Sequence, residues 1–259
     1  MEETKPLTAV RITSEGKKPK EELVVREVPL TIILNSKELV TLLCTPSGLT
    51  HLAVGFLASE GLLKEKEDIK EMVLNEKGWY IQINVDESTI DLEALSSRRL
   101  ITSGCAGVAS FYRSTDARLA APIDSPLRIS RDQVFSLMKR FQQKSSLFRK
   151  TGGVHSCALG TTEEIQVFAD DIGRHNAVDK VFGECLLKDI STIDKVLLTS
   201  GRVSSEILLK VVKRQVPIII SPAAPTDLAT DLAQKLNLTV IGFVRGKRMN
   251  VYSAAERVI

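Results

Sequence analysis

In the second half of the chain, short apolar runs alternate with amphipathic runs, and this alternation is the feature that most constrains the fold. Short runs rich in Val, Ile and Leu predict strands at 196–199, 216–220 and 238–244, and amphipathic runs predict helices at 204–215 and 226–236. Helices that link successive strands favour a parallel sheet that is covered on both faces. We therefore expect an α/β fold with a mostly parallel sheet and helices on both faces.

A hairpin and two further helices are predicted before this alternation. Residues 154–159 and 165–169 are expected to be strands joined by a polar link. Ser130 and Gln133 have the spacing of a capping box, which predicts a helix of about twelve residues. Another helix should follow the hairpin, because an apolar face recurs there at helical spacing, formed by Ala177, Val178, Val181, Phe182, Cys185 and Leu186.

The first half of the chain is predicted to form a smaller α+β portion. Residues 1–22 are polar and rich in lysine, which predicts a flexible tail. Residues 23–125 are expected to hold a hairpin that turns at Asn35-Ser36, a helix that ends near Gly61 and two more short strands. Residues 126–259 would then form the α/β core.

Charge and cysteine content limit the class of protein. The 35 basic and 32 acidic residues give a net charge of +3, without the concentrated basic face that binding to duplex nucleic acid requires. No run approaches the roughly 20 apolar residues that span a bilayer, and the N-terminus lacks the apolar segment of a signal peptide. Four scattered cysteines without a C-x-x-C pair are expected to be reduced thiols. These features predict a cytoplasmic protein that binds neither nucleic acid nor a membrane.

The polar loops after the predicted strands indicate an anion site. Ligands of open parallel sheets bind beyond the carboxyl ends of the strands, where helix N-termini offer free N–H groups and arginine offers a fork of donors. The alternative is that these are ordinary turn, cap and surface residues. The candidate residues are Asp171, Arg174, His175, Ser200, Gly201, Arg202, Ser221, Arg245, Gly246, Lys247 and Arg248.

Cys105 differs from the other cysteines in its surroundings. It lies between Gly104 and Gly107 in a run of small residues, which predicts an exposed or tightly turned loop. Arg98 and Arg99, a few residues upstream, could stabilise a thiolate. A loop thiolate can accept a sulfur atom as a persulfide and release it by displacement. The alternative is an incidental loop cysteine.

Cys44, Cys157 and Cys185 lie in apolar runs, where free cysteine behaves as a small buried side chain. Together with His155 and His175, these cysteines are residue types that bind zinc, so a zinc site is an alternative. Structural zinc sites, however, pair their ligands at short fixed spacings that are missing here. We therefore expect no zinc, and expect His175 to be a hydrogen-bonded part of the helix entry or of the anion site.

Several segments carry a recognisable combination of residues. The longest runs from Asp171 to Lys180 and reads Asp-Ile-Gly-Arg-His-Asn-Ala-Val-Asp-Lys. The others are Leu52–Leu57 with Ser59–Gly61, Thr151–His155, Ser200–Arg202 with Ser204, Ser221 with Pro225-Thr226, and Gly242–Arg248. From about residue 23 onward, the chain resembles the formate dehydrogenase accessory sulfurtransferases.

The resemblance implies a fold and an activity. The fold is a core related to that of cytidine deaminase, without deaminase chemistry because the zinc-ligand signature is missing. The activity is that of a sulfur carrier. It would take persulfide sulfur from a cysteine desulfurase on Cys105 and pass it to Mo-bis-molybdopterin guanine dinucleotide, the molybdenum cofactor of formate dehydrogenase. A homodimer is also implied, as is cofactor contact by Phe243, Val244, Arg245, Gly246, Lys247 and Arg248. GDP would be a fragment ligand.

One detail of the sequence differs from some members of the family. Some members of the family carry a second cysteine three positions after the first, and this chain has Val108 there, so a relay by a single cysteine is expected. A chaperone that binds the guanylated cofactor or apo-formate dehydrogenase without chemistry is the alternative, and it would need the anion site but not the Cys105 thiol. A nucleotide hydrolase is disfavoured because the sequence contains no P-loop.

Overall fold

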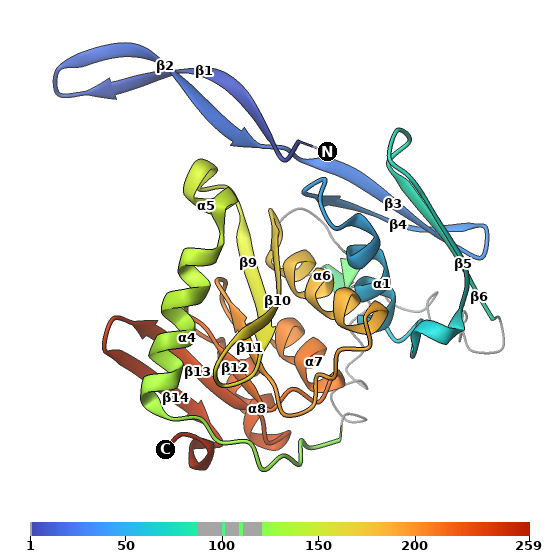
Figure 1. Cartoon of the computed structure of the whole chain (residues 1–259), viewed down its shortest axis with the longest axis vertical. Coiled ribbons are helices and arrows are strands. Elements are labelled where there is room, and N and C mark those ends of the chain that lie inside the picture. The colour runs from blue at the N-terminus through green and yellow to red at the C-terminus, as the bar shows by residue number, and fades with distance from the viewer. Residues whose placement is uncertain (1, 87–99, 102–108, 111–120) are drawn as a thin grey trace.

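The computed structural model describes residues 2–86, 100–101, 109–110 and 121–259. Cys105, the expected sulfur-carrying residue, lies outside the described residues. Two sheets with helices packed on them form the body of the molecule, and a long two-stranded ribbon extends from it (Figure 1).

A six-stranded sheet lies at the centre of the C-terminal core. Its strands have the spatial order β10-β9-β11-β12-β13-β14. The pairs β11–β12 and β12–β13 are parallel, whereas β10–β9, β9–β11 and β13–β14 are antiparallel. Their bounds are β9 His155–Gly160, β10 Ile165–Asp171, β11 Val196–Thr199, β12 Ile218–Ile220, β13 Thr239–Arg245 and β14 Arg248–Ser253.

The prediction of a mostly parallel sheet is therefore wrong, and the sheet is mixed. The hairpin β9–β10 pairs with β11 in the antiparallel sense, which the alternation of later strands and helices did not reveal. The strand β14 was not predicted, because its first residue, Arg248, belongs to the cationic run that was interpreted as a loop. Gly246 has a φ of 58°, which a glycine adopts without steric cost, and this allows the turn into β14.

Helices cover both faces of this sheet, as predicted. The helices α6 (Arg174–Leu187), α7 (Ser205–Lys213) and α8 (Asp227–Lys235) pack on the face that presents Leu197. The helix α4 (Arg131–Lys144) packs on the opposite face, and the expected capping box of Ser130 and Gln133 begins it. The short helix α5 (Ser146–Thr151) follows α4 and was not predicted. No helix in the described part of the chain is both long and apolar enough to cross a bilayer.

The N-terminal portion is built on a four-stranded sheet with the order β4-β3-β6-β5. The predicted hairpin turns at Asn35 and Ser36, which both have positive φ, as a tight hairpin turn requires. The helix α1 covers this sheet and ends before Gly61, as expected. The remaining bounds are β3 Val28–Leu34, β4 Lys37–Cys44, α1 Leu49–Ser59, η1 Lys66–Asp68, β5 Ile69–Asn75, β6 Tyr80–Val85, β7 Leu100–Ile101, β8 Ala109–Ser110 and η3 Ala255–Arg257.

The two portions are joined where α1 crosses α6 (Figure 1). A Cβ atom on Gly55 would lie 1.8 Å from the carbonyl oxygen of Asp179, and one on Gly183 would lie 1.9 Å from that of His51. Real atoms cannot approach so closely, so the two glycines allow backbone to pack directly on backbone. The joint is therefore a close-packed part of the interior.

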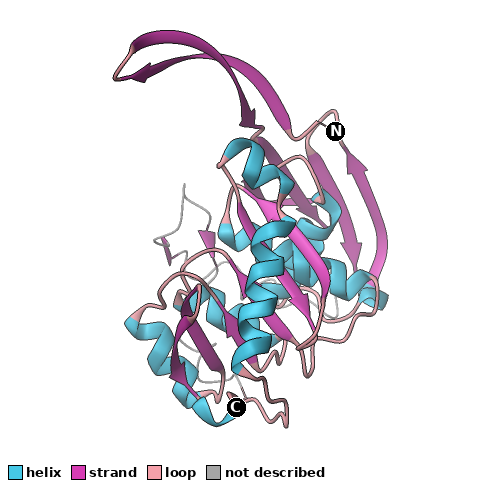
Figure 2. Ribbon diagram, turned by 60° about the vertical axis from the view of Figure 1, so that its left-hand side comes forward, coloured by secondary structure: helices cyan, strands magenta, loops and turns pink. Residues whose placement is uncertain are grey.

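The expected flexible tail instead forms a regular antiparallel ribbon of β1 (Thr4–Thr13) and β2 (Gly16–Val25). Figures 1 and 2 both show it projecting from the body. β-branched residues such as Val10 and Ile12 favour extended backbone, and Gly16, with a φ of 124°, closes the turn. The sequence interpretation gave more weight to the lysines of this segment than to its β-branched residues.

Candidate functional site

The loops that were predicted to gather do meet at one edge of the six-stranded sheet. Strand β10 has the same direction as β11, because each is antiparallel to β9. The carboxyl ends of β10, β11, β12 and β13 therefore share an edge. The Ser221 hydroxyl donates to the carbonyl oxygen of Gly201 at 2.7 Å, and Arg245 Nε donates to the carbonyl oxygen of Pro222 at 3.0 Å. These bonds connect the three loops that follow β11, β12 and β13.

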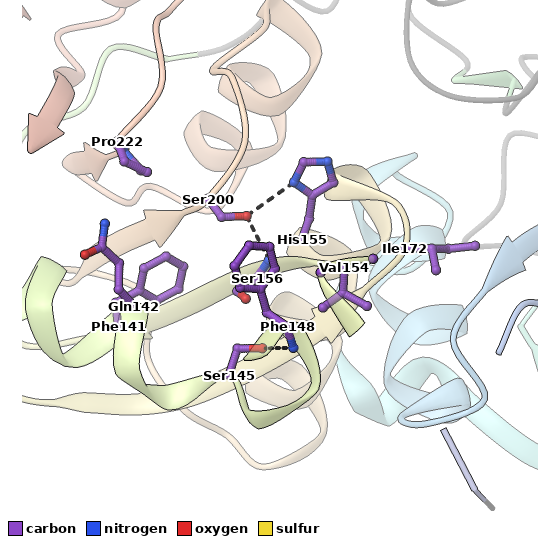
Figure 3. Close-up of a pocket in the computed structure, with 12 residues that line it drawn as sticks. Phe141, Gln142, Ser145, Phe148, Val154, His155, Ser156, Ile172, Ser200 and Pro222 are labelled. Atoms are coloured by element: carbon purple, nitrogen blue, oxygen red, sulfur yellow. Dashed lines mark hydrogen bonds between the residues drawn. The ribbon is translucent and has the colours of Figure 1, made fainter. Parts of the chain in front are cut away.

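A cavity of about 610 Å³ opens beside this edge, within the range of sites that hold small molecules and cofactors. Its wall combines aromatic and aliphatic side chains with hydroxyl and imidazole groups (Figure 3). The residues come from α4, from α5 and the links on either side of it, from β9, and from the loops after β10, β11 and β12. They are Phe141, Gln142, Ser145, Phe148, Gly152, Gly153, Val154, His155, Ser156, Ile172, Ser200 and Pro222.

Ser200 and His155 form the polar centre of the cavity wall. The Ser200 hydroxyl oxygen accepts from the backbone N–H of Ser156 at 2.9 Å and lies 3.3 Å from Nδ1 of His155 (Figure 3). The hydroxyl hydrogen can therefore be donated to Nδ1, which leaves the imidazole proton on Nε2. Burial, reinforced by the positive charges of Arg174 and His175, lowers the pKa of His155. His155 is thus a neutral donor at neutral pH.

Arg174 lies behind this pair, at the first position of α6. Its side chain is only 8% exposed, and its buried Nε has no hydrogen-bond partner in the structure. A Cβ on Gly201 would lie 3.0 Å from Arg174 Cδ and 3.6 Å from His155 Nδ1. Because Gly201 has no side chain, the side chains of Arg174 and His155 can both pack against the loop after β11. An unsatisfied buried donor is costly, so an acceptor bound here would be strongly favoured.

Asp170 holds two serines of the cavity wall. Its carboxylate accepts from the hydroxyl groups of Ser145 at 2.7 Å and Ser156 at 2.6 Å, and both serines line the cavity. Burial raises the pKa of Asp170 in spite of these two hydrogen bonds. Neither His155 nor Asp170 was among the predicted site residues. The register of the predicted hairpin could have found the contact between Asp170 and Ser156, which are direct cross-strand partners.

Of the predicted site residues in the described part of the chain, Ser200 lines the cavity, and Asp171, His175 and Arg202 lie in other surroundings. Asp171 is fully buried in the joint between the two portions, where Lys180 lies 2.7 Å from it. Nε2 of His175 lies 3.0 Å from the carboxylate of Glu206, but the two groups do not have the geometry of a hydrogen bond, so the expected hydrogen-bonded role of His175 stays a prediction. Arg202 is exposed on the loop after β11. Ser200, Gly201, Ser221 and Arg174, by contrast, are brought together.

The segment 243–248 forms the end of the β13–β14 hairpin. Arg245, Gly246, Lys247 and Arg248 are exposed. The guanidinium of Arg245 lies 5.6 Å from the centre of the Phe243 ring, within the range of a cation–π contact. The hydrogen bond of Arg245 to Pro222 places this cationic turn next to a residue that lines the cavity. Its contact with a cofactor stays a prediction.

Cys44, Cys157 and Cys185 are buried, as predicted. Burial raises the pKa of Cys44 and of Cys185 to about 12, and raises that of Cys157 well above its ordinary value. Because the thiolate is the nucleophile, none of these three residues is suited to carry sulfur. Within the described ranges no cluster of three or more His, Cys, Asp or Glu side chains could hold a metal ion. The absence of zinc stays a prediction.

Comparison with known proteins places the chain in a family. A model of the FdhD/NarQ family matches residues 25–259. The chain belongs to the FdhD/NarQ family. The match begins at the end of the N-terminal ribbon and includes both sheets, so the joint and the cavity lie within the region that defines an FdhD/NarQ protein.

Relatives of this FdhD/NarQ family member carry informative names. The sulfur carrier protein FdhD of Bacillus subtilis (strain 168) is 44% identical over 92% of this chain and 91% of its own length. That of Halalkalibacterium halodurans is 40% identical over 99% and 97%. The crystal structure of a chain from Desulfotalea psychrophila, assigned as a formate dehydrogenase accessory protein, superposes with a TM-score of 0.80 at 28% identity, over 99% of both chains.

Proposed function

We propose that this protein is a sulfur carrier for the maturation of formate dehydrogenase. It would accept persulfide sulfur from a cysteine desulfurase on Cys105 and pass it to Mo-bis-molybdopterin guanine dinucleotide. The names of the relatives support sulfur transfer and formate dehydrogenase as the client. The buried, high-pKa thiols of the other three cysteines support Cys105 as the carrier.

The loading step is a displacement at sulfur. The Cys105 thiolate attacks the terminal sulfur of the donor persulfide, the S–S bond of the donor breaks, and the donor leaves as a thiolate. The new S–S bond holds the transferred sulfur on Cys105, so atoms and electrons balance without another reactant. Reduced thiols are required throughout, which agrees with our proposal of a cytoplasmic location. From the resemblance, we also propose a homodimer.

The cavity is proposed to hold the guanine nucleotide end of the cofactor. The rings of Phe141 and Phe148 provide apolar wall for a purine. The Nε2–H of His155 and the guanidinium of Arg174, which lies behind the Ser200–His155 pair, provide donors for phosphate oxygens. The observation that carries this assignment is the buried Arg174 Nε without a hydrogen-bond partner, behind the Ser200–His155 wall of a cavity of nucleotide size.

Calorimetric titration with GDP tests the assignment. Arg174→Gln removes the buried charge and should weaken GDP binding by about tenfold or more, because a charge-assisted hydrogen bond contributes roughly 1.5–3 kcal/mol. Arg202→Gln is the matched control, since Arg202 is an exposed arginine on an adjoining loop, and it should leave the affinity unchanged. If the wild type and Arg174→Gln bound GDP with equal affinity, the cavity would not be the nucleotide site.

The cationic turn can be tested separately. Replacement of Arg245 and Arg248 together by alanine should weaken GDP binding by roughly 1.5–3 kcal/mol for each charged hydrogen bond that is lost. An unchanged affinity of this double variant, with a loss in Arg174→Gln, would restrict the site to the cavity. An unchanged affinity in both variants would contradict the proposed nucleotide site at this edge altogether.

A further inference from the structure

Two serine hydroxyl groups in the wall of the cavity are bound to the same carboxylate. Ser156 lies on β9, directly opposite Asp170 of β10, and Ser145 lies in the link between α4 and α5. The Ser156 hydroxyl donates to Oδ1 of Asp170 at 2.6 Å, and the Ser145 hydroxyl donates to Oδ2 at 2.7 Å. Each oxygen of the carboxylate thus binds one serine that lines the cavity.

The charge of Asp170 fixes the direction of these two hydrogen bonds. Burial raises the pKa of Asp170, whereas the hydrogen bonds from Ser156 and Ser145 and the positive charge of Lys180 lower it. The ordinary pKa of aspartate lies about three units below neutral pH, so the carboxyl group is ionised there. An ionised carboxylate has no hydrogen to donate. Both serines must therefore donate their hydroxyl hydrogens to Asp170.

The two serine oxygens consequently offer only acceptors to the cavity. A hydroxyl oxygen has two lone pairs, and within the described part of the chain that of Ser156 accepts no hydrogen bond. The Ser145 oxygen accepts from the backbone N–H of Phe148 at 2.9 Å, which leaves it one lone pair. A ligand atom that binds either oxygen must carry a hydrogen. A phosphate group, which brings acceptors and negative charge, is disfavoured at this position.

The donors of the cavity lie on the other side of β9. Cys157 packs on the α6 side of the sheet and Ala158 on the α4 side. Because consecutive side chains of a strand point to opposite faces, His155 belongs to the α6 side and Ser156 to the α4 side. Nε2 of His155 carries a hydrogen, and the guanidinium of Arg174 lies behind it. A ligand with a phosphate group and a group of donors therefore fits the cavity in one orientation.

Aromatic side chains flank the serine acceptors. Phe141 precedes Ser145 by about one helical turn, Phe148 follows it within α5, and both rings line the cavity (Figure 3). A planar base packs well on such rings. Guanine carries an N–H at N1 and an amino group at N2 on the same edge, so its two neighbouring donors match the two acceptors. Adenine has an acceptor at N1 and no amino group at position 2.

We propose that Asp170, acting through Ser156 and Ser145, makes the cavity selective for guanine. The N2 amino group, with two hydrogens, donates to the Ser156 oxygen, which has two lone pairs to offer, and N1–H donates to the Ser145 oxygen. The phosphate groups lie toward His155 and Arg174. Asp170 is a positioning residue, since it orients the hydroxyl groups without touching the base. The inference rests on the proposed nucleotide site and adds to it the recognition of the base.

Calorimetric titration of the full chain with GDP, IDP and ADP tests the proposal. IDP differs from GDP only in the absence of the N2 amino group, and should bind about tenfold more weakly because the Ser156 oxygen is left unpaired. ADP should bind more weakly still, since its N1 acceptor would face the Ser145 oxygen. Equal affinities for GDP and IDP would overturn the proposal.

Ser156→Ala tests the contact with the amino group. It removes the acceptor of the N2 group and leaves Asp170 in place, so GDP should bind about as weakly as IDP binds to the wild type, while the affinity for IDP should change little. If Ser156→Ala weakened GDP and IDP by the same factor, the Ser156 hydroxyl would not recognise the amino group, and the proposal would be wrong.

Asp170→Asn tests the orientation of the hydroxyl groups. The amide group of asparagine donates to one of the serines, whose own hydrogen then points into the cavity against a guanine donor. The preference for GDP over ADP should fall by about tenfold. A purely structural role of Asp170 would weaken both nucleotides equally and keep the preference, which would contradict the proposal. Asp132→Asn is the matched control, since that carboxylate is 82% exposed on α4, and it should keep the preference of the wild type.

The ribose is the other part of the nucleotide that could donate to the serines. GDP and 2′-deoxy-GDP should bind equally, and a loss confined to 2′-deoxy-GDP would place the ribose at Ser156 and Ser145 and overturn the proposal. A wild type that binds no GDP would contradict the nucleotide site itself, and this inference with it. GDP binding that depends on Arg174 but is no stronger than the binding of IDP would contradict this inference alone.

Discussion

The ammonium nitrogen of Lys180 lies 2.7 Å from Oδ2 of Asp171, and both side chains are almost completely buried. Lys180 also donates to the Thr45 hydroxyl at 2.6 Å, and the backbone N–H of Thr45 donates to Asp171 at 3.1 Å. The pair thus connects the end of β10, the middle of α6 and the link after β4. It attaches the N-terminal portion to the core directly behind the strand ends that form the candidate site.

Removal of the lysine should be strongly destabilising. Lys180→Met leaves the Asp171 carboxylate buried without its partner, and we expect a loss of about 3–5 kcal/mol in the free energy of unfolding. Lys188→Met is the control, because Lys188 pairs with Glu184 at 2.6 Å on the same helix but is exposed, and should cost no more than about 1 kcal/mol. Urea denaturation measures both. Similar small losses would mean that the buried pair contributes little.

The close contact between α1 and α6 at Gly55 predicts whether an alanine there stabilises or destabilises the protein. On helix propensity alone, Gly55→Ala within α1 should stabilise the protein by roughly 1 kcal/mol. The new Cβ would lie 1.8 Å from the carbonyl oxygen of Asp179, so the helices would have to move apart. We expect a net loss of about 2 kcal/mol or more in thermal or chemical unfolding. A more stable variant would contradict the close approach of the two helices.

Local signals explain why most elements could be predicted from the sequence. The α4 helix begins at the Ser130 capping box, and the β3–β4 hairpin turns at Asn35 and Ser36. These features involve neighbours in the chain. The joint was not predictable in this way, since Gly55 and Gly183 are far apart in sequence and a lysine such as Lys180 is ordinarily expected at the surface.

The candidate site could be predicted only in outline. The loop residues Ser200 and Gly201 were expected at the shared edge because the carboxyl ends of parallel strands meet there. His155 lies at the start of β9, which is antiparallel to β11, so the start of β9 lies at the edge where β11 ends. An argument from the carboxyl ends of parallel strands does not find such a residue. Asp171 was expected in the anion site, but its carboxylate is buried inside the protein, where it forms an ion pair with Lys180.

The two partly buried histidines predict an acid-sensitive stability. Burial is the largest cause that lowers the pKa of His155 and of His51 in the folded protein. The unfolded chain therefore binds protons more readily, so the free energy of unfolding is unaffected well above pH 6.5 and falls as the pH decreases through that value. His155→Asn should make this fall less steep between pH 7 and pH 5, as measured by urea denaturation. Identical pH profiles of the variant and the wild type would contradict the lowered pKa.

The assignment of the sulfur-carrying residue can be tested by comparing two cysteines. Cys105→Ser should abolish activation of formate dehydrogenase in cells, and should prevent a gain of 32 Da (about the mass of one sulfur atom) when the protein is incubated with a cysteine desulfurase and cysteine. Its free energy of unfolding should change little, because the small residues around Cys105 in the sequence offer few packing partners.

Cys185→Ser is the matched control for this experiment. It places a hydroxyl in the buried position that Cys185 occupies on α6 within the apolar core, which should lower the free energy of unfolding by about 1–3 kcal/mol. Sulfur loading and client activation should nevertheless persist, since the pKa of about 12 keeps the Cys185 thiol protonated and unreactive. Normal activation by Cys105→Ser would show that the carrier assignment is wrong. Loss of activation with retained loading of sulfur on another residue would have the same meaning, because the relay proposed here depends on the thiol of Cys105 alone.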